Sequence, residues 1–264
     1  MIGAIAGDII GSPYEGMRNN IRTCDFPLFV ARSRFTDDTV LTVAVADAIM
    51  RGEEYAGKLK EYYHLYPHAG YGGMFIQWAN SASSRPYNSF GNGSAMRVSP
   101  VAYACGTLEE ALGEAARSAA VTHDHPEGVK GAQATAAAAF LARTGESKDY
   151  IREYTEESFG YDLSEPIESL RDWYALEHDP IYVTCQGSVP QAIRAFLDSE
   201  GFEDAVRKAV SIGGDSDTIA CIAGGIAQAY YGVPREIEDK VMARLDERLS
   251  MMTLEFMEKY LHGR

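Results

Sequence analysis

Residues 213–218 of the chain read Gly-Gly-Asp-Ser-Asp-Thr and lead into a small, apolar run that reaches residue 231. A second stretch of the same character, residues 35–39, reads Phe-Thr-Asp-Asp-Thr and also leads into an apolar run. Each stretch resembles a helix start, where Asp residues are favoured, so each could simply cap a helix. Our hypothesis is that the two acidic helix starts meet in space and share divalent cations.

The residue types in these two stretches favour hard cations. Mg²⁺ and Mn²⁺ prefer oxygen ligands, which carboxylates and hydroxyls supply. Asp37 and Asp38 alone cannot enclose an ion, because adjacent residues of a helix point about 100° apart. Placed opposite Asp215, Asp217 and Thr218 they can, and the cations would offset the repulsion among four carboxylates. We therefore expect two divalent cations, Mg²⁺ or Mn²⁺, at this site.

The spacing of apolar residues predicts helices along most of the chain. Glycines at positions 3, 7 and 11 share one face of a helix over residues 2–11. Each glycine costs that helix about 1 kcal/mol relative to Ala, so another backbone should approach this face closely. Ser12 and Pro13 should end the helix, because the residue before a proline disfavours the α region. Further helices are expected at 36–51, 53–66, 74–80, 94–105 with an interruption near Pro100, 107–121, 127–143, 147–158, 165–175, 190–198, 202–212 and 216–231.

The remaining segments carry weaker signals. Ser188 and Pro190 should start the helix at 190–198, and Pro234 should introduce one last helix that runs to about residue 260. The best strand candidate is 180–185. The conformations of 67–90 and 144–187 are left open. The predicted fold class is all-α, in a single domain over residues 1–264.

Composition excludes several classes of partner. The chain has 264 residues and a formal net charge of −14, which argues against binding to nucleic acid by bulk charge or to anionic lipid. No apolar stretch approaches the roughly 20 residues of a membrane span, and the first ten residues lack a basic segment typical of a signal peptide. Four cysteines without a CxxC pair favour free thiols in a reducing compartment, and paired disulfides stay open as the alternative. We expect a cytoplasmic protein.

Two further stretches are candidates for binding. Residues 91–97 read Gly-Asn-Gly-Ser-Ala-Met-Arg and could offer backbone N–H groups to a phosphate, with Arg97 adding a charge, although a plain turn explains them more simply. His123 and His125 could act as a base or as ordinary loop residues, and zinc is disfavoured because no Cys or third His accompanies them. Five aromatic residues could stack on a base or cover the core, and the second explanation is favoured for Trp78: Tyr71, Phe75, Trp78, Tyr87 and Phe90.

Five motifs, taken in order, resemble the ADP-ribosylglycohydrolase family, which includes the dinitrogenase reductase-activating glycohydrolase and the ADP-ribosyl-acceptor hydrolases. The motifs are Gly-Asp-Ile-Ile-Gly-Ser-Pro-Tyr-Glu at 7–15, Phe-Thr-Asp-Asp-Thr at 35–39, Gly-Asn-Gly-Ser-Ala-Met-Arg at 91–97, Thr-His-Asp-His-Pro at 122–126 and Gly-Gly-Asp-Ser-Asp-Thr-Ile-Ala at 213–220. Each motif alone is weak evidence, but five in this order are strong evidence. The resemblance covers residues 2 to about 232.

The resemblance implies an all-α domain with a binuclear metal site. The implied metal ligands are Thr36, Asp37, Asp38, Asp215, Asp217 and Thr218. Glu15 is implied to lie near the metals and the scissile bond, so the candidates for the catalytic base are Glu15, Asp37, Asp38 and Asp215. The implied residues that bind ADP-ribose are Asn92, Gly93, Ser94, Met96 and His123.

The resemblance also implies an activity, the hydrolysis of the glycosidic bond between ADP-ribose and an acceptor such as an arginine side chain. The partner would be an ADP-ribosylated protein or a small ADP-ribose conjugate. Two alternatives stay open: a hydrolase of a small ADP-ribose ester or other ribosyl compound, and a structural protein similar to the J1-type lens crystallins. The acidic motifs are intact, which favours an enzyme. The acceptor, the choice between Mg²⁺ and Mn²⁺, the base and the oligomeric state are left open.

Overall fold

The computed structural model describes residues 1–16, 18–176 and 180–261. Among these residues every regular element is helical, and an isolated β-bridge joins Gly91 to Thr184. The elements are α1 (Ile2–Gly11), η1 (Ser12–Tyr14), α2 (Asp37–Arg51), α3 (Tyr55–Leu65), α4 (Gly73–Asn80), α5 (Gly93–Met96), α6 (Ser99–Ala104), α7 (Leu108–Ala120), α8 (Pro126–Arg143), α9 (Lys148–Phe159), α10 (Ile167–Leu176), η2 (Pro180–Val183), α11 (Cys185–Leu197), α12 (Phe202–Ile212), α13 (Ser216–Tyr231), α14 (Arg235–Met242) and α15 (Glu247–Tyr260). The predicted all-α fold class is confirmed.

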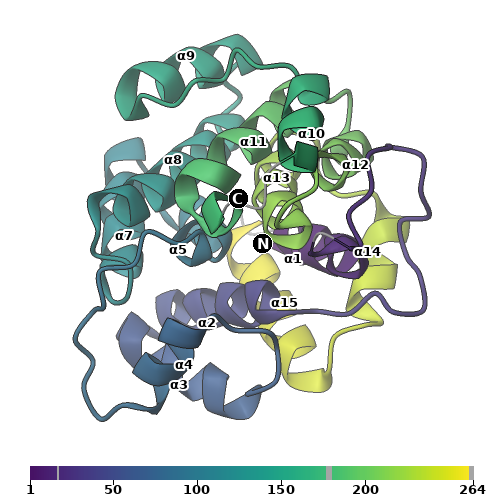
Figure 1. Ribbon diagram of the computed structural model, residues 1–264. Coiled ribbons are helices and arrows are strands. Elements are labelled where there is room, and N and C mark those ends of the chain that lie inside the picture. The colour runs from purple at the N-terminus through teal and green to yellow at the C-terminus, as the bar shows by residue number, and fades with distance from the viewer. Residues whose placement is uncertain (17, 177–179, 262–264) are drawn as a thin grey trace.

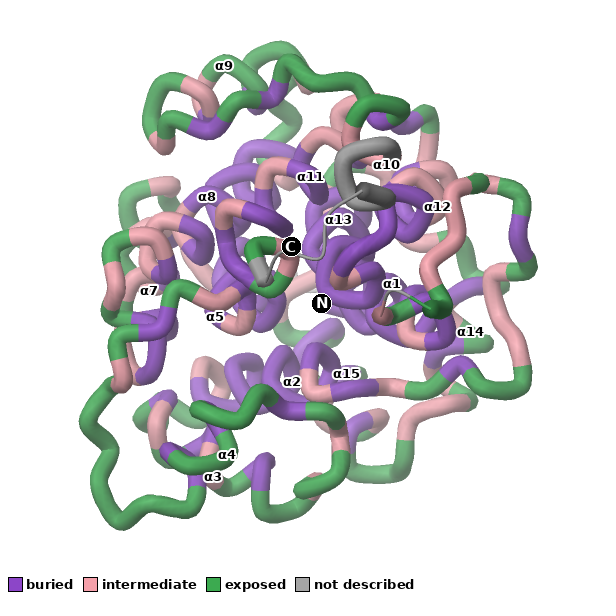
Figure 2. Tube along the Cα trace, in the orientation of Figure 1, coloured by how far each residue is buried: buried purple, intermediate pink, exposed green. Residues whose placement is uncertain are grey.

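Helix α13 lies at the centre, with α1, α8, α11 and α12 packed around it (Figure 1). Figure 2 shows that these helices are buried along much of their length, whereas α9 faces solvent. Every residue of α1 is buried. The buried, hydrophobic helices of the core therefore fix the positions of the ends of α1 and α13.

The glycines of α1 let its backbone meet that of α13. A Cβ at Gly3 or Gly7 would overlap the carbonyl oxygen of Gly224 or Ala220, and a Cβ at Gly11 would lie 2.5 Å from the Cα of Asp217. The predicted close approach of a second backbone is confirmed. It holds the acidic start of α13 directly against α1.

One of two proline-based predictions was wrong, and the other was right for a different reason. The α-helix over residues 2–11 ends at Gly11, as predicted, but Ser12 does not leave the α region: its φ and ψ are −51° and −34°, and the chain continues as the 3₁₀ turn η1. Proline is tolerated there because its missing N–H is not needed in the first turn of a helix. Helix α11 starts at Cys185 rather than near Ser188, because Thr184 caps it by accepting a hydrogen bond from the Gly187 amide, and Pro190 lies inside the helix.

Two other segments also differ from prediction. Residues 180–185 form no strand; η2 and the first residue of α11 occupy them, so tertiary packing overrides the β-propensity of Ile181, Tyr182 and Val183. The C-terminal segment forms two helices instead of one. Asp246 starts the second of them, α15, by accepting a hydrogen bond from the Leu249 amide at 2.9 Å.

The other predicted helices are confirmed to within a few residues, including the break between α5 and α6. All four cysteines are free; Cys185 and Cys221 are buried, and Cys24 and Cys105 are partly buried. Residues 177–179, within the segment 144–187 whose conformation was left open, lie outside the described residues. Within the described ranges, no helix combines the length and hydropathy that a membrane span requires.

Candidate active site: an acidic pocket between two helix starts

The starts of α2 and α13 face each other across a pocket of about 670 Å³, which we call the acidic pocket. Its acidic lining residues are Glu15, Asp37, Asp38, Asp215 and Asp217. The rest of the wall includes the glycine-rich loop 91–93, His123 and the aromatic residues Phe75, Tyr87 and Tyr182. Segments about 180 residues apart in the sequence therefore meet, as the hypothesis of two facing helix starts requires.

Helix α2 begins where its sequence predicts. The Thr36 hydroxyl caps the helix by accepting a hydrogen bond from the Asp38 amide at 3.3 Å. Asp37 and Asp38 thus occupy the first turn, where the helix dipole favours negative charge. The Asp37 amide donates to the carbonyl of Ala69 at 2.9 Å. This bond holds the helix start at the edge of the pocket.

The start of α13 depends on backbone conformations that suit glycine. Gly213 and Gly214 have φ values of +89° and +67°, in the region that other residues disfavour. The side chain of Asn20 accepts a hydrogen bond from the Gly214 amide at 2.8 Å and donates to its carbonyl at 3.2 Å. The turn is therefore fixed on both sides, and it points Asp215 and Asp217 into the pocket.

Asp8 belongs to the site, although it is not among the site residues predicted from the sequence. Its carboxylate accepts hydrogen bonds from the Thr36 amide at 2.9 Å, the Thr36 hydroxyl at 2.7 Å, the Thr39 amide at 3.1 Å and the Thr39 hydroxyl. One signal could have found it: Asp8 is the single charged residue in the apolar helix 2–11, and a buried carboxylate needs partners. Asp8 ties α1 to the start of α2.

The carboxylates form two groups of three that share one member. Ligand atoms of Asp8, Asp38 and Asp217 lie within 4.8 Å of one another, and so do those of Glu15, Asp215 and Asp217. Oδ1 of Asp38 is buried and has no hydrogen-bond partner in the described part of the chain. Clustered oxygen donors with an orphaned carboxylate oxygen are the chemistry that a hard divalent cation would satisfy.

Burial and mutual repulsion raise the pKa values of the acids in the cluster. Burial, followed by the neighbouring carboxylates, raises the pKa values of Asp37, Asp38 and Asp217 well above their ordinary range. Burial also raises the pKa of Asp8, Glu15 and Asp215; repulsion from Asp215 and Asp8 adds to the shift at Glu15, and the hydrogen bond from Asn92 opposes it at Asp215. These shifts favour the protonated forms, and a bound cation would compete with those protons.

The structure brings most of the expected ADP-ribose residues to the pocket, but not all. Asn92, Gly93, Met96 and His123 line it, whereas Ser94 is buried and its hydroxyl donates to the Gly128 carbonyl at 2.7 Å. Asn92 donates to Oδ2 of Asp215 at 2.7 Å and to the Ser188 hydroxyl at 2.9 Å, so in this structure it positions an acidic residue.

The two histidines of residues 122–126 have different environments. His123 lines the acidic pocket, whereas Nδ1 of His125 accepts a hydrogen bond from the Glu127 amide and caps α8. Trp78 is buried in the core, as expected, and Phe75 and Tyr87 line the pocket. Thr36 is not among the residues that line the pocket, and its hydroxyl donates to Asp8 at 2.7 Å. Thr218 lines the pocket and donates to Oδ2 of Asp38 at 3.3 Å.

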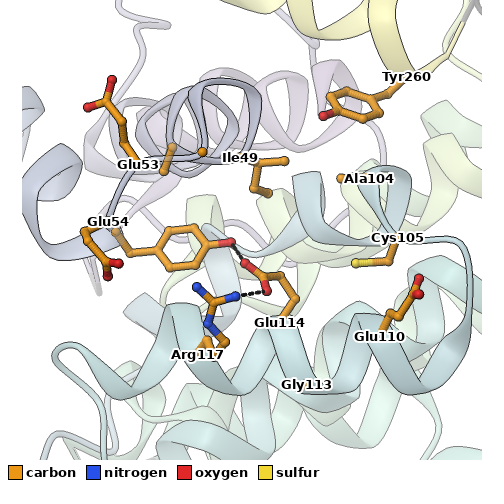
Figure 3. A pocket seen from close by; sticks show the side chains of 13 residues that line it. Ile49, Glu53, Glu54, Ala104, Cys105, Glu110, Gly113, Glu114, Arg117 and Tyr260 are labelled. Atoms are coloured by element: carbon orange, nitrogen blue, oxygen red, sulfur yellow. Dashed lines mark hydrogen bonds and ion pairs between the residues drawn. The ribbon is translucent and has the colours of Figure 1, made fainter.

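A second cavity of about 590 Å³ lies at the other end of α2, and we call it the rear cavity (Figure 3). Three of its four acidic residues, Glu53, Glu110 and Glu114, have partners among the described residues. Glu114 accepts hydrogen bonds from the Tyr55 hydroxyl and, at 2.7 Å, from Arg117. Glu110 accepts from the amides of Gly106 and Thr107 and closes the capping box of α7. The acidic pocket is therefore the candidate active site.

Comparison with known proteins agrees with this fold. A family model described as ADP-ribosylglycohydrolase matches residues 1–263. ADP-ribosylhydrolase ARH3 from Bos taurus is 27% identical over 309 residues, which cover 88% of this chain and 84% of the relative. ADP-ribosylarginine hydrolase Tri1 from Pseudomonas putida (strain GB-1) is 26% identical over 283 residues, 91% of this chain and 72% of the relative.

A solved chain described as an ADP-ribosylglycohydrolase-related protein complex has the same fold, with a TM-score of 0.69 and 23% identity over 98% of this chain and 97% of that chain. The match to the family model extends over nearly the whole sequence and includes all five motifs. The chain therefore belongs to the ADP-ribosylglycohydrolase family.

Proposed function

We propose that this protein is a metal-dependent hydrolase that cleaves the glycosidic bond between ADP-ribose and an acceptor and releases ADP-ribose. One observation carries the proposal: this member of the family has two clusters of three carboxylates that share Asp217. The relatives named ADP-ribosylhydrolase and ADP-ribosylarginine hydrolase support the reaction class. The second name makes a modified arginine side chain the first acceptor to test.

Two divalent cations, Mg²⁺ or Mn²⁺, would be held by residues of the acidic pocket. The ligands we propose are Thr36, Asp37, Asp38, Asp215, Asp217 and Thr218, with Glu15 beside them. When bound, such cations would polarise the sugar oxygens and lower the pKa of a water molecule. Asp8 would act behind the ligands, because its hydrogen bonds to Thr36 and Thr39 hold the first turn of α2 in place.

We propose that Glu15 moves the proton. It follows η1 at the exposed edge of the pocket, and burial and its acidic neighbours raise its pKa above the ordinary range. A base whose pKa lies closer to neutrality transfers protons more effectively in both directions. Asp37 is half-buried on the opposite wall, and Asp215 is held by Asn92. We assign Glu15 the proton of the attacking water and keep Asp37, Asp38 and Asp215 as alternative bases.

The test is a panel of substrates scored for free ADP-ribose. Protein modified on arginine, protein modified on serine and a small ADP-ribose ester are each incubated with Mg²⁺, Mn²⁺ or EDTA. We expect release that requires a metal and that is lost in the double variant Asp215→Ala plus Asp217→Ala. Full activity of the double variant would refute the roles assigned here, and release from the ester alone would favour the alternative substrate class. Tight Mn²⁺ binding without turnover on any substrate would favour a binding or structural protein.

A further inference from the structure

Arg97 is one of the largest fully buried side chains, and it lies next to the acidic pocket. Its Nη2 donates hydrogen bonds to the Ser118 carbonyl at 3.0 Å and to the Thr122 hydroxyl at 2.8 Å. A guanidinium is only a donor, so the Thr122 oxygen must be the acceptor of this bond. Nε and Nη1 of Arg97 have no hydrogen-bond partner among the residues that the structure describes. The buried charge therefore acts on its surroundings with little local compensation.

Thr122 links this charge to His123. The hydroxyl oxygen of Thr122 lies 2.7 Å from Nδ1 of the His123 ring, and Thr122 is fully buried. If Thr122 donates its hydrogen, Nδ1 is unprotonated and Nε2 carries the proton. If Nδ1 donates, the Thr122 hydrogen needs another acceptor, and the Tyr87 hydroxyl is the group that approaches it. The two tautomers of His123 thus correspond to two directions of the Thr122 hydroxyl hydrogen.

The guanidinium decides between these two arrangements. An N–H dipole at Nδ1 would point its positive end toward the Arg97 charge, whereas an unprotonated Nδ1 turns its lone pair toward that charge. Burial and the charge of Arg97 also lower the pKa of His123 well below its ordinary value, so the ring is neutral. A neutral ring whose Nδ1 accepts must carry its proton on Nε2.

Nε2 of His123 faces the glycine-rich loop of the pocket. A Cβ on Gly93 would lie 3.2 Å from Nε2 and one on Gly91 would lie 3.6 Å away. No hydrogen bond to Nε2 is formed within the described ranges. The two glycines therefore leave this edge of the ring uncovered, and the donor on Nε2 has no acceptor from the protein itself.

We infer that Arg97 and Thr122 are positioning residues that set the tautomer of His123, so that its Nε2–H is offered to an acceptor oxygen of the bound ligand. The identity of that ligand as an ADP-ribosyl group rests on the proposed function, but the tautomer does not. The device supplies a directed donor without adding a titrating charge to a pocket whose acids already repel one another. Arg97 acts through Thr122, because its own side chain is fully buried.

The tautomer can be measured directly in the ligand-free protein. Histidine labelled with ¹⁵N is incorporated, and long-range ¹H–¹⁵N correlation spectra distinguish the two nitrogens of each ring; a His123→Gln variant identifies the signal. We expect Nε2 to be protonated in the wild type. Thr122→Val should shift the ring toward the other tautomer or a mixture, Thr122→Ser should restore the wild-type pattern, and Tyr87→Phe should leave it unchanged.

Binding gives a second readout. Calorimetry with ADP-ribose should show affinity weakened by about tenfold in Thr122→Val and within about twofold of wild type in Thr122→Ser. Thermal unfolding of each variant checks that it is folded. A wild-type ring protonated on Nδ1, or a tautomer unchanged in folded Thr122→Val, would overturn the inference. If the substrate panel releases no ADP-ribose while the tautomer pattern holds, the proposed function fails and the positioning role stands.

Discussion

Helix α2 has an acidic cavity at each end, and the two cavities differ in how their carboxylates are satisfied. In the rear cavity Glu114 is bound by Tyr55 and Arg117, and Glu53 pairs with Lys58 at 3.4 Å. In the acidic pocket Asp38 has a buried oxygen with no partner in the described part of the chain, and burial, followed by repulsion from the neighbouring acids, raises its pKa. Acidic residues alone therefore do not identify a site. A site is indicated where the chain gathers acids and supplies no cation of its own.

The macrodipole of α2 sharpens this difference. Its N-terminus favours negative charge and stabilises Asp37 and Asp38, so the acidic pocket is built where the backbone itself offsets some repulsion. The offset is small beside the mutual repulsion of six clustered carboxylates, of which Glu15 alone is exposed: Asp8, Glu15, Asp37, Asp38, Asp215 and Asp217. A bound cation would have to balance the remaining repulsion among the carboxylates.

Replacing one shared carboxylate should have the largest effect. Asp217→Asn removes the member common to both groups, and loss of about 4 kcal/mol of transition-state stabilisation corresponds to about a 10³-fold fall in kcat/KM for ADP-ribose release. Glu114→Gln in the rear cavity should stay within about twofold of wild type. Steady-state kinetics with an arginine-modified substrate measures both, and more than a tenth of wild-type activity in Asp217→Asn would contradict the assignment.

Cation binding should stabilise the folded protein by mass action. At 100 times the dissociation constant, Mn²⁺ or Mg²⁺ should add about 2.7 kcal/mol, which raises Tm by roughly 5–10 °C for a chain of this size. Asp217→Asn should lose most of this response, and Glu114→Gln should keep it. Thermal unfolding with and without EDTA provides the measurement. An equal response in the two variants would mean that the cations bind elsewhere.

Replacing a helical glycine by alanine should lower stability at one position and raise it at another. Gly7→Ala places a methyl group against the Ala220 carbonyl, so the protein should lose about 1–3 kcal/mol through overpacking. Because Gly7 precedes Asp8, metal affinity should fall as well. Gly113→Ala beside the rear cavity meets open space on an exposed helix and should add up to about 1 kcal/mol. Urea unfolding compares the two, and a neutral Gly7→Ala would show that α1 and α13 can separate without loss.

The smallest predicted effect is the pH dependence of the metal-free protein. A carboxyl group whose folded pKa is raised contributes stability below its unfolded pKa, and this contribution is lost as pH rises through the folded pKa. The raised pKa of Asp217 therefore destabilises the wild type relative to Asp217→Asn above about pH 4. In EDTA at pH 7 the variant should be more stable than the wild type, and the difference should shrink as pH falls toward 4. Urea unfolding across this range tests the sign, and a wild type more stable than the variant at pH 7 would contradict it.

Local signals located most helices correctly. Thr36 with Asp37 and Asp38, and the Thr107 and Glu110 capping box, mark helix starts because a cap and its amides lie within three residues of each other. The same signals failed at Pro190 and in residues 180–185. At those positions the conformation depends on packing against distant segments, such as the β-bridge between Gly91 and Thr184.

The sequence by itself determined the all-helical fold, the two acidic helix starts and the glycine face of α1, because each follows from residue types a few positions apart. Only the tertiary structure decided that Asp8 binds Thr36 and Thr39, that Ser94 turns away from the pocket, and that Arg97 acts on His123 through Thr122. These contacts join separate helices and loops. Their geometry follows from how closely α1 packs on α13 and from where each loop then lies, which no local pattern encodes.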